Sequence, residues 1–403
     1  KINHNGTVKK YGTWDSEQPK HYQTDVLRRL AVNYLDRKAS GSKPFFLSVA
    51  PLAPHVEAGD RIRAKYGAYS PRPAPRHKGA FSDRKLPRPP SFDEPVVRDK
   101  PRHIRKFDRM SAADTRRVRT RYRAQLESLL AVDEMVGAIV KKLRDSGELA
   151  NTTIMFTSDN GYFNGEHRIR TGKIHPYEPS IRVPLIIRGP GFPAGRTIGQ
   201  AVSNVDWAPT IMRAARARAG LTMDGRPVQE LVRDPKSGDW RQLLFETGPK
   251  GKQRWYAAVR GARYKYIKHS NGEVELYDRK KDPHELASRH ADPAYRDVRA
   301  RLAKRLKELR HCSGRSCWGL RPASGKDDPV GEPIDNPPET SPGAATASAT
   351  GGGSGGEAEG PEGDTGLPVT GLALGGLLAL GGGTALAGIG LRAVKRRRRA
   401  DAG

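Results

Sequence analysis

The pattern that most constrains this chain is an alternation of amphipathic helical segments with short apolar runs. Apolar side chains recur at helical spacing over residues 24–38 and, for longer, over 115–145. Short apolar runs occupy residues 45–49, 153–158 and 183–187, and turn residues end each of them. Helices that alternate with short buried strands predict an α/β fold built around a sheet.

Local signals give the expected boundaries of these elements. Thr24 or Asp25 is suited to cap the first helix, and Gly147 is suited to follow the last turn of the second. Residues 61–114 are rich in Pro, Arg and Lys with weak periodicity, which predicts a long surface excursion.

Polar residues stand directly after two of the predicted strands. His55 follows the first, and Asp159 and Asn160 follow the second. In α/β sheets the functional groups lie beyond the strand ends, so we expect these three side chains to share one site. Carboxylate and amide oxygens suit Ca²⁺ or Mg²⁺ better than Zn²⁺, although Asp-Asn-Gly alone is also a common turn.

A different pattern begins near residue 240. Three short alternating runs predict antiparallel strands at residues 255–260, 264–268 and 274–277. Asn271-Gly272 is a hairpin turn signal between the last two strands, and a basic helix is expected over 292–310. These elements predict a small α+β subdomain.

The net charge of +28 raises the question of a nucleic-acid partner. The arginines are spread over nearly every segment, and neither a recognition helix nor an RNA-binding aromatic motif is present. We therefore expect no nucleic-acid partner. Two interpretations of the charge stay open: a generally arginine-rich composition, or attraction to polyanionic substrates such as sulfated glycans.

The C-terminal residues form three parts in a fixed order. Leu-Pro-Val-Thr-Gly at 367–371 is followed by a twenty-residue apolar run at 372–391 and a basic cluster at 395–399. The run is long enough to span about 30 Å of hydrocarbon. The order resembles the sortase sorting signal of Gram-positive surface proteins, whereas an ordinary tail anchor is the alternative. The resemblance implies transient membrane retention, cleavage by sortase between Thr370 and Gly371, and attachment to peptidoglycan.

Cys312 and Cys317 are the only cysteines, separated by four residues that include a glycine. A metal site would need more ligands than this pair and His311. Because the predicted location is secreted and cell-wall anchored, we expect a disulfide between them.

Several segments of the first 320 residues resemble the sulfatase family. The similar segments are Pro44–Leu47, Ala53–His55, Thr157–Tyr162, Gly165–Arg168, Gly172–Lys173, Ile181–Gly191, Val205–Thr210, Glu275–Asp278 and Asp282–Leu286. The cysteine pair is similar to one near the C-terminus of N-acetylglucosamine-6-sulfatases, which makes that group the nearest resemblance.

The resemblance implies a fold like that of alkaline phosphatase and hydrolysis of a sulfated glycan or aryl sulfate. It also implies a bound divalent cation, usually Ca²⁺, and a formylglycine nucleophile made in a Cys/Ser-x-Pro-x-Arg motif. Asp159 and Asn160 match metal ligands, and His55 matches the histidine that contacts the sulfate. Lys173 matches a lysine on the sulfate or leaving-group oxygen, and His167 is expected near the pocket rim.

The chain departs from the family pattern at the nucleophile. It has no Cys/Ser-x-Pro-x-Arg motif in a convincing context, and Cys312 lacks the proline. The paired N-terminal aspartates of the metal site are also missing, and Asp25 is better explained as a helix cap. We expect formylglycine upstream of Lys1 and no turnover by this chain alone. The alternatives are a phosphodiesterase or phosphonate hydrolase of the same superfamily, and a wall-displayed glycan-binding protein without catalysis.

The predicted organisation therefore has four parts. Residues 1–239 form the C-terminal portion of a catalytic domain that is incomplete at its N-terminus, and residues 240–320 form the α+β subdomain. Residues 321–366, rich in Pro, Gly, Ser, Thr and acidic residues, are a disordered linker, and 367–403 are the sorting signal.

Deletion of residues 367–371 is expected to move the protein from the cell wall to the membrane or the medium, because transpeptidation needs the pentapeptide. Cell fractionation with immunodetection measures the shift. Deletion of five linker residues, 351–355, is the control and should leave the wall fraction intact. An unchanged wall fraction after deletion of 367–371 would refute the sorting signal.

Overall fold

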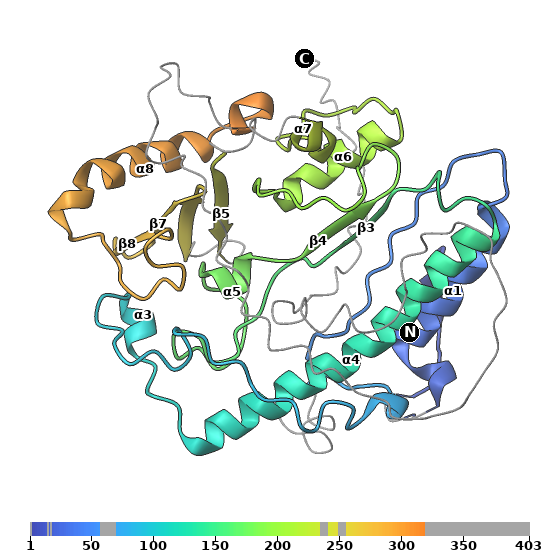
Figure 1. Ribbon diagram of the computed structural model, residues 1–403, viewed down its shortest axis with the longest axis horizontal. Helices are drawn as coiled ribbons and strands as arrows, with labels where there is room; N and C mark the ends of the chain where they lie inside the picture. The colour runs from blue at the N-terminus through green and yellow to red at the C-terminus, as the bar shows by residue number, and fades with distance from the viewer. Residues whose placement is uncertain are drawn as a thin grey trace, which may run out of the picture.

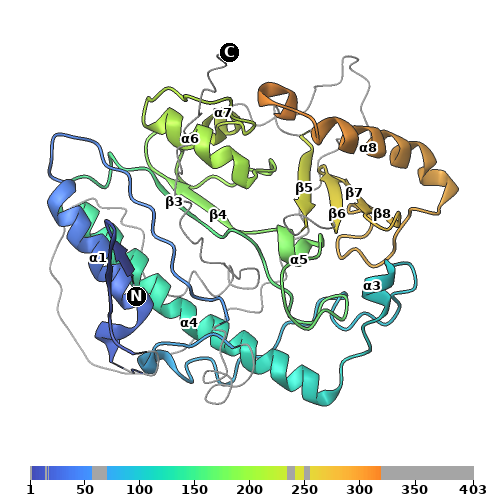
Figure 2. The same cartoon turned by 180° about the vertical axis from the view of Figure 1, so that it is seen from behind.

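The computed structural model describes residues 2–13, 16, 18–56, 70–233, 241–248 and 255–318. In both views helices α1 and α4 lie side by side at one end, and α8 lies along the four strands β5–β8 at the other (Figures 1 and 2). Strands β3 and β4 lie between these two parts. The expected linker, the apolar run at 372–391 and the cleavage site at Thr370 and Gly371 lie outside the described residues, as does the predicted boundary at 239/240.

Helices α1 (Gln23–Lys38) and α4 (Ala112–Asp145) confirm the two predicted helices. Ser111 and Asp114 form a capping box that starts α4, and Gly147, with φ +77°, follows its last turn. The two helices pack through a cluster of buried residues that includes Leu35 and Leu143. Their contact forms one wall of the core.

The prediction that Thr24 or Asp25 caps α1 is wrong. Tyr22 occupies the N-cap position without a side-chain cap, and Asp25 lies inside the first turn with 1 % of its surface exposed. Both Asp25 carboxylate oxygens accept hydrogen bonds of 2.8 Å from the Arg76 guanidinium. This bidentate ion pair ties the helix to a segment about fifty residues further along the chain.

The prediction of a strand at residues 45–49 is also wrong. The segment is extended, but no strand within the described residues forms a ladder with it. Phe45 and Leu47 pack into the cluster between α1 and α4, whereas Phe46 on the opposite side is 66 % exposed. The apolar run therefore packs on the helices instead of joining a sheet.

The expected surface excursion over 61–114 is corrected for the part that the structure describes. Residues 70–111 include the short helices η2 (Pro75–His77) and α3 (Arg102–Arg105), and they cross the molecule from α4 to the C-terminal sheet. Ala74, Lys100 and Ile104 are almost fully buried on this path. Its weak periodicity reflects irregular backbone, which still contributes to the core.

Strands β3 (Ile154–Thr157) and β4 (Leu185–Arg188) match the predicted strands, and they pair antiparallel with Met155 opposite Ile187. The mixed α/β class is confirmed, although this pairing differs from the parallel arrangement typical of an α/β sheet. Gly189, with φ +127°, ends β4 where a Cβ would lie 2.5 Å from the Thr152 carbonyl oxygen. Only glycine fits there.

A helical layer follows β4 along the chain. It contains η3 (Asn204–Asp206), α6 (Trp207–Ala214) and α7 (Val228–Arg233). The Asp206 carboxylate is fully buried and accepts hydrogen bonds of 2.6 and 2.7 Å from Arg241. Asp206 thereby ties this layer to Arg241, two residues before β5.

The C-terminal subdomain is a four-stranded antiparallel sheet in the order β5-β6-β7-β8. Its strands are β5 (Leu243–Thr247), β6 (Tyr256–Arg260), β7 (Tyr264–His269) and β8 (Val274–Asp278). The last three were predicted, and β5 was missed. Helix α8 (Arg296–Leu309), preceded by η5 (Pro293–Tyr295), covers one face through Leu302 and Leu306.

The opposite face of this sheet packs against the rest of the chain. Tyr256, Ile267 and Tyr277 meet Phe163 and Tyr177 in one apolar cluster. The remaining described elements are β1 (Ile2–His4), β2 (Thr7–Lys9), η1 (Pro19–His21), α5 (Glu178–Ile181) and η6 (Gly314–Trp318). None of the helices in the described ranges combines the length and the apolar character that a membrane crossing needs.

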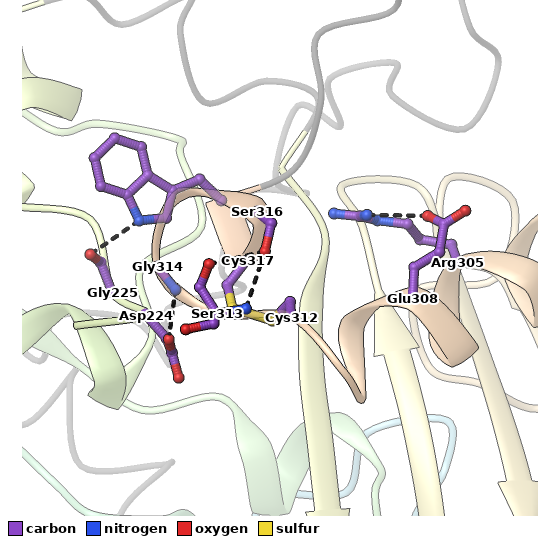
Figure 3. The surroundings of a disulfide bond; sticks show 10 residues. Asp224, Gly225, Arg305, Glu308, Cys312, Ser313, Gly314, Ser316 and Cys317 are labelled. Carbon is purple, nitrogen blue, oxygen red and sulfur yellow. Dashed lines mark hydrogen bonds and ion pairs between the residues drawn. A yellow bond between two sulfur atoms is a disulfide. The ribbon is translucent and has the colours of Figure 1, made fainter. Parts of the chain in front are cut away.

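The expected Cys312–Cys317 disulfide is present at the end of the subdomain (Figure 3). The loop that it closes reaches the segment between α6 and α7, since the Gly314 amide donates to Asp224 at 2.7 Å. The indole of Trp318 donates to the Gly225 carbonyl at 3.0 Å.

Replacing Cys312 and Cys317 together with serine is expected to lower the free energy of unfolding by about 2 kcal/mol, because the short loop is then unconstrained in the unfolded chain. Chemical denaturation of both proteins measures the difference, and peptide mapping without reductant verifies the bond. The double variant Ser313→Ala/Ser316→Ala, within the same loop, is the control. Two free thiols in secreted protein would contradict the assignment.

Candidate functional site

Asp159 and Asn160 follow the end of β3 in the central region, where Asp159 is exposed and Asn160 is half-buried. Thr157 Oγ1 donates to the Pro184 carbonyl at 2.8 Å, which holds the strand end against the start of β4. Ser158 Oγ donates to the Asn160 carbonyl at 2.8 Å, and Asn204 Nδ2 donates to the Asp159 carbonyl at 3.1 Å. These bonds fix the backbone of both predicted metal ligands.

Gly161 allows the chain to turn closely past another segment. Its amide donates to the Ser180 carbonyl at 2.7 Å, and the next amide, of Tyr162, donates to the Pro179 carbonyl at 2.8 Å. A Cβ on Gly161 would lie 2.0 Å from the Pro179 carbonyl oxygen. The approach therefore requires glycine, and it brings the residues around 159 and 180 together.

Lys173 lies on a segment that the same contacts hold in place. The Phe163 amide donates to the Gly172 carbonyl at 2.9 Å, and Ser180 Oγ donates to the Lys173 carbonyl. Burial lowers the pKa of Lys173, and the charge of Asp159 opposes that shift. The ammonium and the carboxylate thus lie within each other's field, as expected for two groups of one site.

The surroundings of the Lys173 ammonium differ from those of Lys100 and Lys265, which face carboxylates. The Lys173 Nζ atom is shielded from solvent, and within the described part of the chain it has no hydrogen-bond partner. A shielded ammonium without a hydrogen-bond partner is costly, so Lys173 is a candidate contact for a bound anion.

His55 lies at the end of the loop that follows the extended segment 45–49. Ala53, two residues earlier, packs in the same cluster as Phe156 of β3, on one side of α4. His55 Nδ1 lies 2.6 Å from the Val56 carbonyl, so Nδ1 carries the proton and Nε2 is left for another contact. The structure places the loop near β3, and the role of His55 stays a prediction.

The expectation that His167 lies near the pocket rim is wrong. Its side chain is 1 % exposed, and Nδ1 forms a 2.7 Å contact with a carboxylate oxygen of Glu94. The ring lies 4.3 Å from the ring of Tyr177. Enclosed in this way, His167 can position its neighbours, and a bound substrate would not reach it directly.

A set of buried charges surrounds His167, and sequence reasoning missed it. Lys100 Nζ lies 3.2 Å from Glu94 and donates to the carbonyl groups of Glu285 and Leu286 at 2.8 and 3.0 Å. Lys100 is fully buried. Nothing in its Pro- and Arg-rich surroundings distinguishes it from an exposed lysine, so the sequence carries no signal for this site.

Glu178 is the centre of a second group of charges. It lies at the start of α5 and forms ion pairs of 2.9 Å with Arg260, 2.8 Å with Lys265 and 3.1 Å with Arg279. Burial opposes its ionisation, but the three cations more than offset it and hold the pKa of Glu178 well below its usual range. The segment that carries Lys173 is thereby anchored to the C-terminal sheet.

Whether a divalent cation fits at Asp159 and Asn160 depends on the number and kind of oxygen ligands. Asp159 and Asn160 offer the hard oxygens that Ca²⁺ prefers. Ca²⁺ takes about six to eight oxygen ligands, more than these two residues supply. Among the residues that the structure describes, no group of three or more His, Cys, Asp or Glu side chains is arranged to hold a metal. The pair fits as part of a ligand set.

Breaking the Glu178 group is expected to destabilise the fold. Glu178→Ala leaves three cations without their carboxylate, and loss of one partner of a buried pair costs about 3–5 kcal/mol. Urea denaturation measures the change. Glu308→Ala removes an exposed partner of Arg305 and, as the control, should cost less than about 1 kcal/mol. Equal effects of the two substitutions would contradict the structural role of Glu178.

Comparison with known proteins gives two family matches. Residues 2–217 match the sulfatase family, and residues 165–312 match the family of N-sulphoglucosamine sulphohydrolase C-terminal regions. The first match includes Asp159, Asn160 and Lys173, and the overlap of the two covers the segment joined to the sheet by Glu178.

Curated relatives show the same likeness. An arylsulfatase of Volvox carteri is 33 % identical over 340 residues, which cover 74 % of this chain and 52 % of the relative. Human N-acetylglucosamine-6-sulfatase is 30 % identical over 353 residues, covering 78 % and 60 %. The chain spans about half the length of the first of these relatives.

A solved structure is similar as well. A protein in complex with its substrate D-glucosamine-2-N,6-O-disulfate aligns with a TM-score of 0.57 and 26 % identity, over 72 % of this chain and 69 % of that chain.

Proposed function

Because this chain belongs to the sulfatase family, we propose that it forms part of a hydrolase that cleaves sulfate esters of sugars. The observation that carries this proposal is the shielded Lys173 ammonium beside Asp159 at the end of β3. A sulfate ester is an anion, and it would supply the partner that this ammonium lacks.

The relatives suggest the class of sugar. One acts on N-acetylglucosamine 6-sulfate by its name, and the similar solved structure holds a sulfated glucosamine. The cysteine pair Cys312 and Cys317 also resembles one in that group. We therefore propose a 6-sulfated glucosamine residue of a glycan as the substrate, with aryl sulfates as convenient test compounds.

The residues of this chain would stabilise charge. Negative charge builds on the bridging oxygen as the S–O bond breaks, and a positioned cation in a poorly solvated site stabilises it strongly. Lys173 supplies this cation from a backbone fixed by Ser180 and Phe163. His55, with its free ring nitrogen, would contact the sulfate from the other loop.

Asp159 and Asn160 would hold Ca²⁺ together with ligands from outside this set. The cation, when bound, would lower the cost of charge on the sulfate oxygens. The family's formylglycine nucleophile has no matching motif in the residues of this chain, and we propose that it lies upstream. A phosphodiesterase or phosphonate hydrolase would differ at that nucleophile.

The C-terminal sequence supports a proposed location. The pentapeptide, the apolar run and the basic cluster support sortase-dependent attachment to peptidoglycan after secretion. A wall-bound hydrolase would meet extracellular glycans directly, which agrees with a sulfated polymer as substrate.

The function is tested by assaying the product of the complete gene, including any residues encoded upstream of Lys1, on an aryl sulfate and on 6-sulfated glucosamine. Lys173→Ala is expected to lower kcat/KM by about 10²–10³-fold, the usual effect of losing one group that stabilises the transition-state charge. The free energy of unfolding of this variant should change little, because Nζ of Lys173 has no hydrogen bond to lose.

Lys141→Ala, on the exposed face of α4, is the matched control and should leave kcat/KM unchanged. Residues 1–366 alone should show no turnover. Metal-dependent turnover by residues 1–366, or full activity of Lys173→Ala, would overturn the proposal.

A further inference from the structure

Three histidine rings meet where the Lys173 segment joins the C-terminal sheet. His103 comes from α3, His175 lies two residues after Lys173, and His269 ends β7. The ring of His103 stacks on that of His175 at 5.1 Å with an interplanar angle of 17°. The same ring meets His269 edge-on at 5.1 Å. We call these residues the histidine cluster.

Apolar groups enclose the inner part of this cluster. The rings of Phe107 and Phe163 lie 6.4 and 6.1 Å from the ring of His175. His175 is half-buried and His269 is buried, whereas His103 stands at the exposed rim. Two imidazolium rings stacked at this distance would repel each other with little solvent between them, so the stack is compatible with neutral rings.

The carboxylates nearby already have partners. Glu275 accepts hydrogen bonds from His269 at 2.7 Å and from Tyr177 at 2.9 Å, and it also accepts from Tyr277. Glu273 accepts from the Arg102 amide at 3.0 Å, and its side chain pairs with Arg105 at 3.3 Å. Neither carboxylate is positioned to neutralise a charged His103–His175 stack completely.

The cluster is linked directly to the predicted site. His175 belongs to the segment 172–177, which begins at the Gly172 carbonyl bonded to Phe163 and ends at Tyr177. Between these two anchors the His175 ring joins the segment to α3 and, through His103, to β7. A change in the stack would therefore move the backbone that carries Lys173.

We propose that the histidine cluster is a pH-sensitive latch. With neutral rings it holds the segment 172–177 against α3 and β7, and uptake of protons by the stacked rings loosens the segment. The effect on Lys173 rests on the proposed function, whereas the latch itself depends only on the geometry of the cluster.

The direction of the pH effect follows from the surroundings. Burial, with smaller contributions from His103, His269 and His167, lowers the pKa of His175 from 6.5 to about 4, and Glu275 opposes the shift. Loss of hydration and the neighbouring His269 lower the pKa of His103, against Glu275 and Glu273. When the segment is open, the His175 ring binds a proton below pH 6.5. In the latched segment its lowered pKa keeps the ring neutral at the same pH. Through His175, latching is therefore complete above pH 6.5 and weakens about tenfold per pH unit as the pH falls from 6.5 toward 4, and the lowered pKa of His103 acts in the same direction.

Hydrogen exchange of the complete chain tests the latch without substrate. Protection factors, which correct for the intrinsic pH dependence of exchange, are measured for residues 172–177 at pH 7 and pH 5. We expect them to fall on the order of 30-fold in the natural protein. In His103→Phe/His175→Phe, which keeps the aromatic stack without its titration, protection should be independent of pH. His311→Phe, at an exposed histidine, is the control and should behave as the natural protein.

Equal pH dependence in the double variant and the natural protein would overturn the proposal, as would constant protection of the natural protein from pH 7 to 5. If the double variant fails to fold, NMR titration of the His175 ring in the natural protein decides, since a midpoint at or above 6.5 refutes the latch. Absence of sulfatase activity would leave these readouts unaffected. An active enzyme with pH-independent protection would refute the latch alone.

Discussion

The buried charges around Glu178 hold the two parts of the molecule together. Glu178 on α5 faces Lys265 on β7, and Lys265 also pairs with Glu285 beyond β8. The Glu178 amide donates to the Glu285 carboxylate at 2.8 Å, so each carboxylate is held by more than one partner. Charges removed from water are tolerated only when they are paired and hydrogen-bonded in this way. The position of the Lys173 segment therefore depends on the C-terminal sheet.

The sequence predicted those parts of the fold whose signals are local. Gly147 after α4 and the Asn271-Gly272 turn between β7 and β8 depend on neighbouring residues only. Contacts between residues far apart in the chain could not be predicted from the sequence. Asp25 carries a helix-cap signal, and only the structure shows that it binds Arg76 about fifty residues later. The same holds for the burial of Lys100 against Glu285.

In the candidate site, too, local motifs identified residues, whereas their surroundings became known only from the structure. Asp159, Asn160 and Lys173 could be singled out because their motifs resemble those of a family, and the structure places Asp159 and Lys173 within reach of each other's charge. His167 stood in a similar motif and was placed wrongly. The partners that enclose it, Glu94 and Tyr177, are seventy-three residues earlier and ten later, and a short motif does not reveal whether its histidine faces solvent or core.

Lys173 differs from three other buried cations in what surrounds it. Lys100, Lys265 and Arg241 each face a carboxylate, which offsets the cost of their burial. The Lys173 ammonium has the field of Asp159 and, within the described residues, no hydrogen bond. The field of Asp159 favours the charged form, and under the proposed function an anionic sulfate ester would supply the hydrogen-bond partner. The arrangement lowers stability locally, and such a cost would be expected at the proposed site, which would have to bind a sulfate ester and release it.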